Sequence, residues 1–192
     1  MDQGDEELLS LLATDLDHHF RRLVENYQQR LYLLAFRLTG CRADAEDIVQ
    51  EVFLRAYHAL RGFPGRKVQV MRLRQWLYTI TLNIFRNHKR KHEHPSVPFD
   101  LSENSPLLEI ADLSPGPEEE ADWHERQREL ELRVAALPES YRVAVTLYYF
   151  EELSYAEIAE LLSQPIGTVK AHISRAKRLL QKLLETQEDG VK

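Results

Sequence analysis

The 192-residue sequence lacks several features that define common protein classes. A single cysteine, Cys41, excludes an internal disulfide framework and fits a reducing compartment. No apolar run approaches the length needed to cross a membrane, and the acidic start MDQGDEELLSLL lacks the plan of a signal peptide. Glycine and turn-forming pairs are scarce, which favours helices. We therefore expect an all-α cytoplasmic protein without membrane insertion.

Charge is divided into blocks along the chain, although the net charge is only −6. Residues 66–91 contain eight basic side chains and no acid, whereas residues 95–125 contain nine acids, five of the eight prolines and no Lys or Arg. The acidic stretch cannot bury enough apolar surface to offset the entropy lost on ordering. We predict two small helical domains, 1–94 and 123–192, joined by a flexible acidic linker at 95–122.

The basic stretch RLRQWLYTITLNIFRNHKRK, residues 72–91, has the pattern of a helix that is apolar on two flanks. Between the flanks runs one polar stripe at spacings of three and four residues. Its members are Arg72, Gln75, Thr79, Asn83, Arg86 and Arg90. A cationic ridge on a helix packed between two neighbours suits a polyanionic ligand. The alternative is a buried helix with a solvated edge.

Two further helices are predicted before this one. An apolar stripe from Leu16 ends at Gly40, a residue suited to a C-cap, and a second helix spans Asp44 to Leu60 with carboxylates in its first turn. The side of the second helix opposite its core stripe carries Asp47, Gln50, Glu51, Leu54 and Arg55. This polar face with one apolar residue could be a docking surface or simply solvated. Gly62 to Val70 are predicted to form a short loop.

The sequence pattern of the C-terminal part predicts a helix-turn-helix. A helix near residues 123–136 precedes one that starts at Pro138, and Ser154 with Glu157 forms a capping box before a third. A tight break at 163–166 leads to a long final helix without acids until residue 185. The outward residues of this helix are Lys170, Ala171, Ser174, Arg175 and Arg178. Small and basic groups on the second helix suit a DNA reader; the alternative is a basic packing helix.

Three segments resemble the extracytoplasmic-function sigma factors of the sigma-70 family, which are bacterial RNA polymerase initiation factors. They are DAEDIVQEVFLRAY, WLYTITLNIFRNHKR and LPESYRVAVTLYYFEELSYAEIAELLSQPIGTVKAHISRAKRLL. The resemblance implies a factor that directs core polymerase to specific promoters and promotes open-complex formation. It implies no enzymatic activity, cofactor or metal.

The resemblance also implies roles for the three segments. In the first, Asp47, Gln50, Glu51, Leu54 and Arg55 would bind the clamp of core polymerase. In the second, the polar stripe and Trp76 would read the melted minus-ten strand, with bases stacking on aromatic rings. The loop 62–70 would hold a flipped base. In the third, Thr168, Lys170, Ala171, Ser174 and Arg175 would face the duplex minus-thirty-five element, with Arg178 near phosphate.

The resemblance implies two further features. The linker would thread through the polymerase cleft, although a solubilising tether fits its composition equally well. An anti-sigma factor would hold the chain inactive.

Two other functions remain open on the residues alone. A stand-alone dimeric helix-turn-helix regulator of duplex DNA would explain the C-terminal part but not the polar faces of the first domain. An enzyme or metal protein could be built on His88, His92 and His94, but the neighbouring Lys89, Arg90 and Lys91 oppose a cation.

Overall fold

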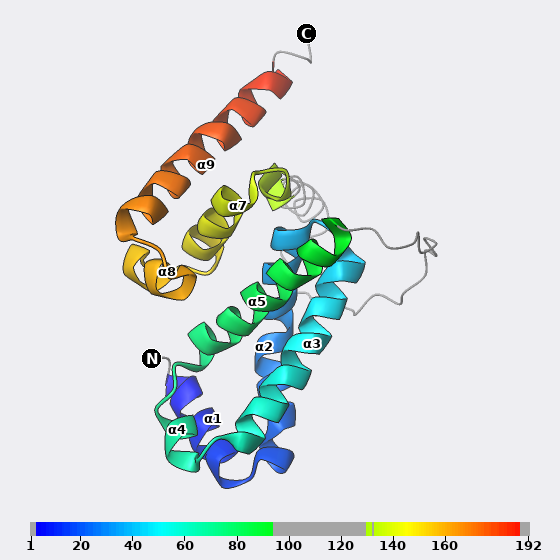
Figure 1. The fold of residues 1–192 in the computed structure, drawn as a ribbon, viewed down its shortest axis with the longest axis vertical. Coiled ribbons are helices and arrows are strands. Elements are labelled where there is room, and N and C mark those ends of the chain that lie inside the picture. The colour runs from blue at the N-terminus through cyan, green and yellow to red at the C-terminus, as the bar shows by residue number, and fades with distance from the viewer. Residues whose placement is uncertain (1–2, 94–129, 132, 189–192) are drawn as a thin grey trace, which may run out of the picture. The chain divides into compact units, whose positions relative to one another are not determined.

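The computed structural model describes residues 3–93, 130–131 and 133–188, and every regular element in these ranges is a helix (Figure 1). The described residues fall into two compact units, 3–35 with 42–93, and 36–41 with those after 129. The all-α prediction is confirmed for these residues. The predicted linker, 95–122, and the predicted start of the second domain lie outside them.

Three long helices agree with the sequence pattern, and they belong to the first unit apart from the last four residues of α2, 36–39. They are α2 (Leu16–Thr39), α3 (Arg42–Gly62) and α5 (Leu73–Glu93), and α3 packs along α5 (Figure 1). Gly40 has a φ of +72°, which glycine adopts without strain, so the predicted C-cap of α2 is confirmed. The stripes that face the core are buried, as the helical period requires. They include Leu23, Leu31, Leu34, Ile48, Val52, Leu77 and Leu82.

Two short helices of this unit are not predicted from the sequence. Residues Gln3–Thr14 form α1, which packs against α4 (Gly65–Gln69). The prediction that residues 62–70 form a loop is therefore wrong in part, because Gly65–Gln69 are helical. Val68 of this helix turns inward and is 3% exposed. The Tyr27 hydroxyl donates to Asp5 over 2.6 Å and ties α1 to α2. Burial, followed by this bond and the charge of Asp5, raises the pKa of Tyr27 well above its ordinary value.

The second unit contains α7 (Glu139–Val145), the π-helical turn η1 (Thr146–Phe150), α8 (Tyr155–Leu162) and α9 (Ile166–Glu188). Pro138 is the N-cap of α7 rather than its first helical residue. α7 and α8 both pack on α9, around a small apolar core. That core includes Val134, Leu137, Val145 and Ala176. The wide turn η1 begins directly after the last residue of α7.

The α8-turn-α9 segment is set by local chemistry. The predicted capping box is present, because the Glu157 N–H donates to Ser154 Oγ over 3.3 Å and Glu157 Oε2 accepts from the Ser154 N–H over 2.9 Å. α8 ends at Ser163, which adopts the left-handed conformation with φ of +53°. The Gln164 N–H then donates to the carbonyl of Ala159 over 2.9 Å and closes the turn. The predicted helix-turn-helix is therefore formed.

The capping box predicts a measurable stability effect. Ser154→Ala removes the acceptor for the Glu157 N–H and should lower the free energy of unfolding of the second unit by about 0.5–2 kcal/mol. Ser140→Ala, at an exposed serine within α7, is the matched control and should stay within about 0.5 kcal/mol of the parent. Urea unfolding followed by circular dichroism measures both. Equal stabilities of the two variants would contradict the structural role of the box.

Candidate nucleic-acid interface

The polar stripe of α5 lies on the surface between two buried flanks. Leu77 and Tyr78, on opposite flanks, are both fully buried, which fixes the rotation of the helix about its axis. The ridge residues Arg72, Thr79, Asn83, Arg86 and Arg90 are exposed, and Gln75 is half-buried. The Arg90 guanidinium donates to Asn87 Oδ1 over 2.9 Å, and Thr79 Oγ1 donates to the Gln75 carbonyl over 2.8 Å. Asn83, at the centre of the ridge, is an exposed amide.

Aromatic and cationic groups gather where the chain enters α5. Trp76 is half-buried, and its ring lies 6.0 Å from that of Phe63. The Lys67 ammonium lies 3.6 Å from the centroid of the Phe63 ring, within cation–π range. Val70 at the end of this segment is 77% exposed. The segment predicted to be a loop thus presents exposed cations, Arg66 and Lys67, from the short helix α4.

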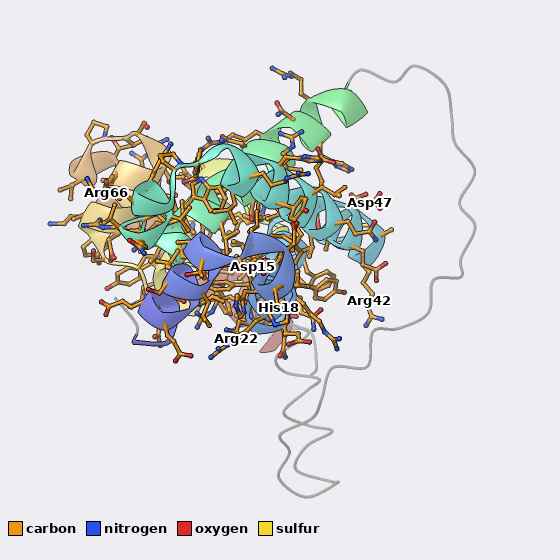
Figure 2. All side chains as sticks on the ribbon, turned by 90° about the horizontal axis from the view of Figure 1, so that it is seen from below. Asp15, His18, Arg22, Arg42, Asp47 and Arg66 are labelled. Atoms are coloured by element: carbon orange, nitrogen blue, oxygen red, sulfur yellow. The ribbon has the colours of Figure 1, made fainter. Side chains whose placement is uncertain are left out.

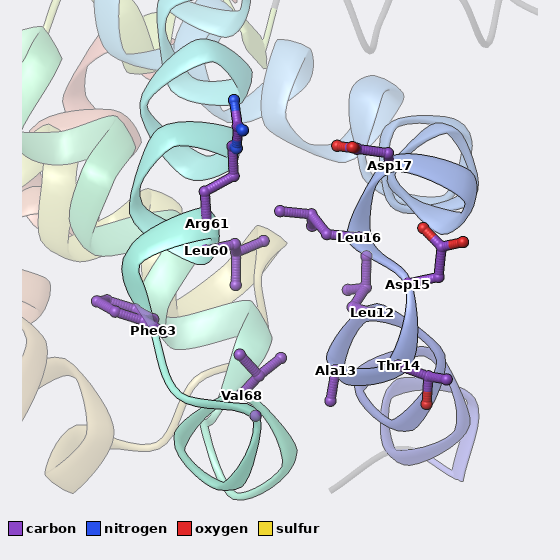
Figure 3. Close-up of a pocket in the computed structure, with 11 residues that line it drawn as sticks. Leu12, Ala13, Thr14, Asp15, Leu16, Asp17, Leu60, Arg61, Phe63 and Val68 are labelled. Carbon is purple, nitrogen blue, oxygen red and sulfur yellow. The ribbon is translucent and has the colours of Figure 1, made fainter.

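A hollow of about 340 Å³ opens beside α4, and the sequence pattern did not reveal it. Figure 3 shows its two walls, Leu60 to Val68 on one side and Leu12 to Asp17 on the other. The charged groups in its lining are Asp15, Asp17 and Arg61. The Tyr57 hydroxyl donates to Asp17 over 2.5 Å, and this bond is the main cause that raises the pKa of Tyr57. The hollow therefore has mixed charge rather than a cationic lining.

The predicted docking face of α3 is on the surface. Asp47, Gln50 and Arg55 are exposed, Glu51 is half-buried, and Leu54 keeps 58% of its surface in solvent. Figure 2 shows Asp47 and Arg42 on α3, with both side chains directed outward. The Arg55 guanidinium and the Glu51 carboxylate pair over 2.7 Å. This face lies opposite the stripe that packs into the core.

The predicted outward face of α9 is largely confirmed as a surface. Lys170, Ser174, Arg175 and Arg178 are exposed, while Thr168 and Ala171 are half-buried. Val169, Ile173 and Ala176 are buried on the opposite side and hold α9 against α7 and α8. The first turns of α9 therefore present a small residue and several cations together, as a helix that enters a major groove does.

Of the three histidines proposed as an alternative metal site, the structure describes the side chain of His88. His88 Nε2 lies 3.8 Å from Asp44 Oδ1, so this ring faces the start of α3. The side chains of His92 and His94 lie outside the described residues. Among the residues that the structure describes, no helix is both long and apolar enough to cross a bilayer.

Comparison with known proteins identifies two family segments. Residues 23–94 match the model of sigma-70 region 2, and residues 127–180 match that of sigma-70 region 4. The extracytoplasmic-function (ECF) RNA polymerase sigma factor SigW of Bacillus subtilis is 33% identical over 174 residues, covering 86% of this chain and 88% of SigW. The RNA polymerase sigma-H factor of Pseudomonas aeruginosa is 31% identical over 188 residues, covering 95% of each chain.

Solved structures share the fold. CnrH, solved in complex with the cytosolic domain of CnrY, matches with a TM-score of 0.66 and 22% identity over 96% of this chain and 99% of that chain. The sigma factor RpoE of Bartonella quintana, solved with the anti-sigma factor NepR, matches with a TM-score of 0.60 and 24% identity over 86% and 96%.

A region 2 helix bundle followed by a region 4 helix-turn-helix defines the class of bacterial RNA polymerase initiation factors of the sigma-70 family. Within that class, the chain belongs to the extracytoplasmic-function sigma factors. Its function is therefore that of a sigma factor, and the stand-alone dimeric regulator is not favoured.

Proposed function

We propose that three exposed faces, on α3, α5 and α9, each carry one part of the sigma-factor function. The α3 face around Gln50 and Leu54 binds the clamp of core polymerase, the α5 ridge reads the melted minus-ten strand, and the outward side of α9 reads the minus-thirty-five duplex. The observation that carries the proposal is the ridge of α5, which holds amide and guanidinium groups in solvent between buried flanks. The proposed domains are 1–94 and 123–192, with 95–122 as the linker.

The partners follow from the same family membership. We propose that the protein works in the cytoplasm with core polymerase and promoter DNA, as a binding factor rather than an enzyme. An anti-sigma factor is a further proposed partner, because the structurally similar RpoE was solved with one. The exposed Leu54 in a polar setting supports a protein-binding role for α3, since aliphatic groups in solvent are favourable once covered.

The polymerase-binding face is tested by Gln50→Ala combined with Glu51→Arg. The double variant should weaken binding to core polymerase at least tenfold, or about 1.4 kcal/mol, because it reverses a charge inside the proposed contact. The exposed Arg55–Glu51 pair contributes only about 0.3–0.5 kcal/mol to stability, so the fold should persist. Fluorescence anisotropy with labelled chain measures the affinity.

The matched control for this test changes the same residue types elsewhere. Gln28→Ala with Glu6→Arg alters two exposed residues on α1 and α2 and shifts the net charge equally. It should bind core polymerase as the parent does. If both double variants lose affinity alike, the effect is one of net charge and the α3 assignment is wrong.

The α5 ridge is tested by Asn83→Ala. This variant should bind core polymerase and the upstream duplex normally but form fewer open complexes, because it loses an amide suited to the edge of an exposed base. A template already mismatched through the minus-ten region should recover part of the loss, since unpairing no longer has to be offset by protein contacts. Permanganate footprinting of unpaired thymines measures opening. Asn26→Ala, at an exposed asparagine of α2, is the control.

The α9 surface is tested by substituting two of its arginines one at a time and comparing the effects. Arg175→Ala should cost about 1–3 kcal/mol on the preferred promoter and relax discrimination at one upstream base pair. Arg178→Ala should weaken all sequences alike and reduce the slope of log affinity against log salt by roughly one. Holoenzyme binding to a promoter library at several salt concentrations measures both. Identical behaviour of the two variants would refute the groove-facing assignment.

A further inference from the structure

Three tyrosines gather beside the first turns of α9, and none belongs to the DNA-reading residues predicted from the sequence. Tyr148 and Tyr149 lie in η1, and Tyr155 opens α8. The rings of Tyr148 and Tyr155 are parallel within 7°, with centroids 4.7 Å apart. The ring of Tyr149 meets Tyr148 edge-on, with centroids 4.9 Å apart. The Tyr155 ring therefore has a neighbour that fixes its orientation.

The neighbouring Tyr148 also affects the titration of Tyr155. The interaction with the Tyr148 hydroxyl is the first cause, ahead of burial, that raises the pKa of Tyr155 above its ordinary value. The phenol consequently stays neutral across the physiological range. Tyr155 therefore presents an uncharged ring whose orientation is set by stacking on Tyr148.

Lys170 lies over this ring. Its ammonium is 5.5 Å from the centroid of Tyr155, within the range of a cation–π contact. Lys170 is exposed on α9, and in the described part of the chain no carboxylate is paired with it. A carboxylate partner would neutralise the ammonium and occupy its donors. An aromatic ring restrains the flexible stem while the full charge and the N–H donors stay available.

We propose that Tyr155 is a positioning residue for recognition of the upstream promoter element, because its ring, braced by Tyr148, holds the Lys170 ammonium in place for a base-edge acceptor. Lysine at a recognition helix donates to the O6 and N7 acceptors of guanine. A free lysine loses side-chain entropy on making such a contact, and restraint before binding reduces that loss. The inference rests on the proposed role of α9 as the duplex reader.

The test uses the full chain assembled with core polymerase on a promoter selected by the parent holoenzyme from a randomised library. A set of duplexes, each with one upstream base pair changed, is measured by competition binding. Lys170→Ala first identifies the base pair at which discrimination depends on Lys170. Tyr155→Leu should then reduce discrimination at that same pair about two- to fivefold and leave the other pairs unchanged. Tyr155→Phe keeps the ring and should retain at least half of the parent's discrimination.

A double variant and a neighbouring tyrosine provide the controls. Lys170→Ala with Tyr155→Leu should discriminate no less than Lys170→Ala alone, because the ring acts through the lysine. Tyr149→Leu, at a tyrosine that is 53% exposed, should leave the ratios at the Lys170 pair as in the parent. Tyr155→Gln repeats the test with a helix former in case the leucine variant does not fold, as judged by thermal melting.

The outcomes separate this inference from the function on which it rests. If Lys170→Ala changes discrimination at one pair but the Tyr155 variants lacking a ring do not, the positioning role is wrong and the reader assignment stands. A uniform loss over all sequences in Tyr155→Leu, or a further loss in the double variant, also overturns it. If Lys170→Ala changes no pair, the assignment of Lys170 to the groove is wrong and the inference fails with it.

Discussion

The burial of both flanks of α5 is the constraint on which the first unit depends. Leu77 on one flank and Tyr78 on the other are removed from water, so the helix cannot turn without exposing one of them. Turning would also bury part of the Arg and Asn ridge, and a buried guanidinium without a partner costs several kcal/mol. The narrow polar ridge is thus held outward by the packing on either side.

The same packing presents the face of α3. Because α3 lies along α5 and buries Ala45, Ile48 and Val52, its opposite side remains in solvent with Leu54 among polar groups. One packed helix pair therefore carries both the proposed polymerase face and the proposed minus-ten ridge. A substitution in its core would disturb both surfaces at once, whereas substitutions on either exposed face separate them.

In the second unit, the orientation of α9 is set by chemistry at the two ends of α8. The capping box fixes where α8 begins, and the left-handed Ser163 fixes where it stops. With α8 defined over eight residues, Tyr155 at its start comes to lie under Lys170 of α9. The tight connection at Ser163 thus places the start of α8 against the outward side of α9.

The sequence by itself determined the long helices, their buried stripes and the helix-turn-helix, because periodicity, capping residues and the Gly40 C-cap act over a few neighbours along the chain. Only the tertiary structure decided that Gln3–Thr14 and Gly65–Gln69 are helical, since these short segments gain stability by packing on each other. The η1 turn, the mixed-charge hollow and the Tyr155–Lys170 contact likewise required the fold. Each of these features either brings together residues from different helices or depends on a backbone irregularity. Local sequence patterns predict neither of these.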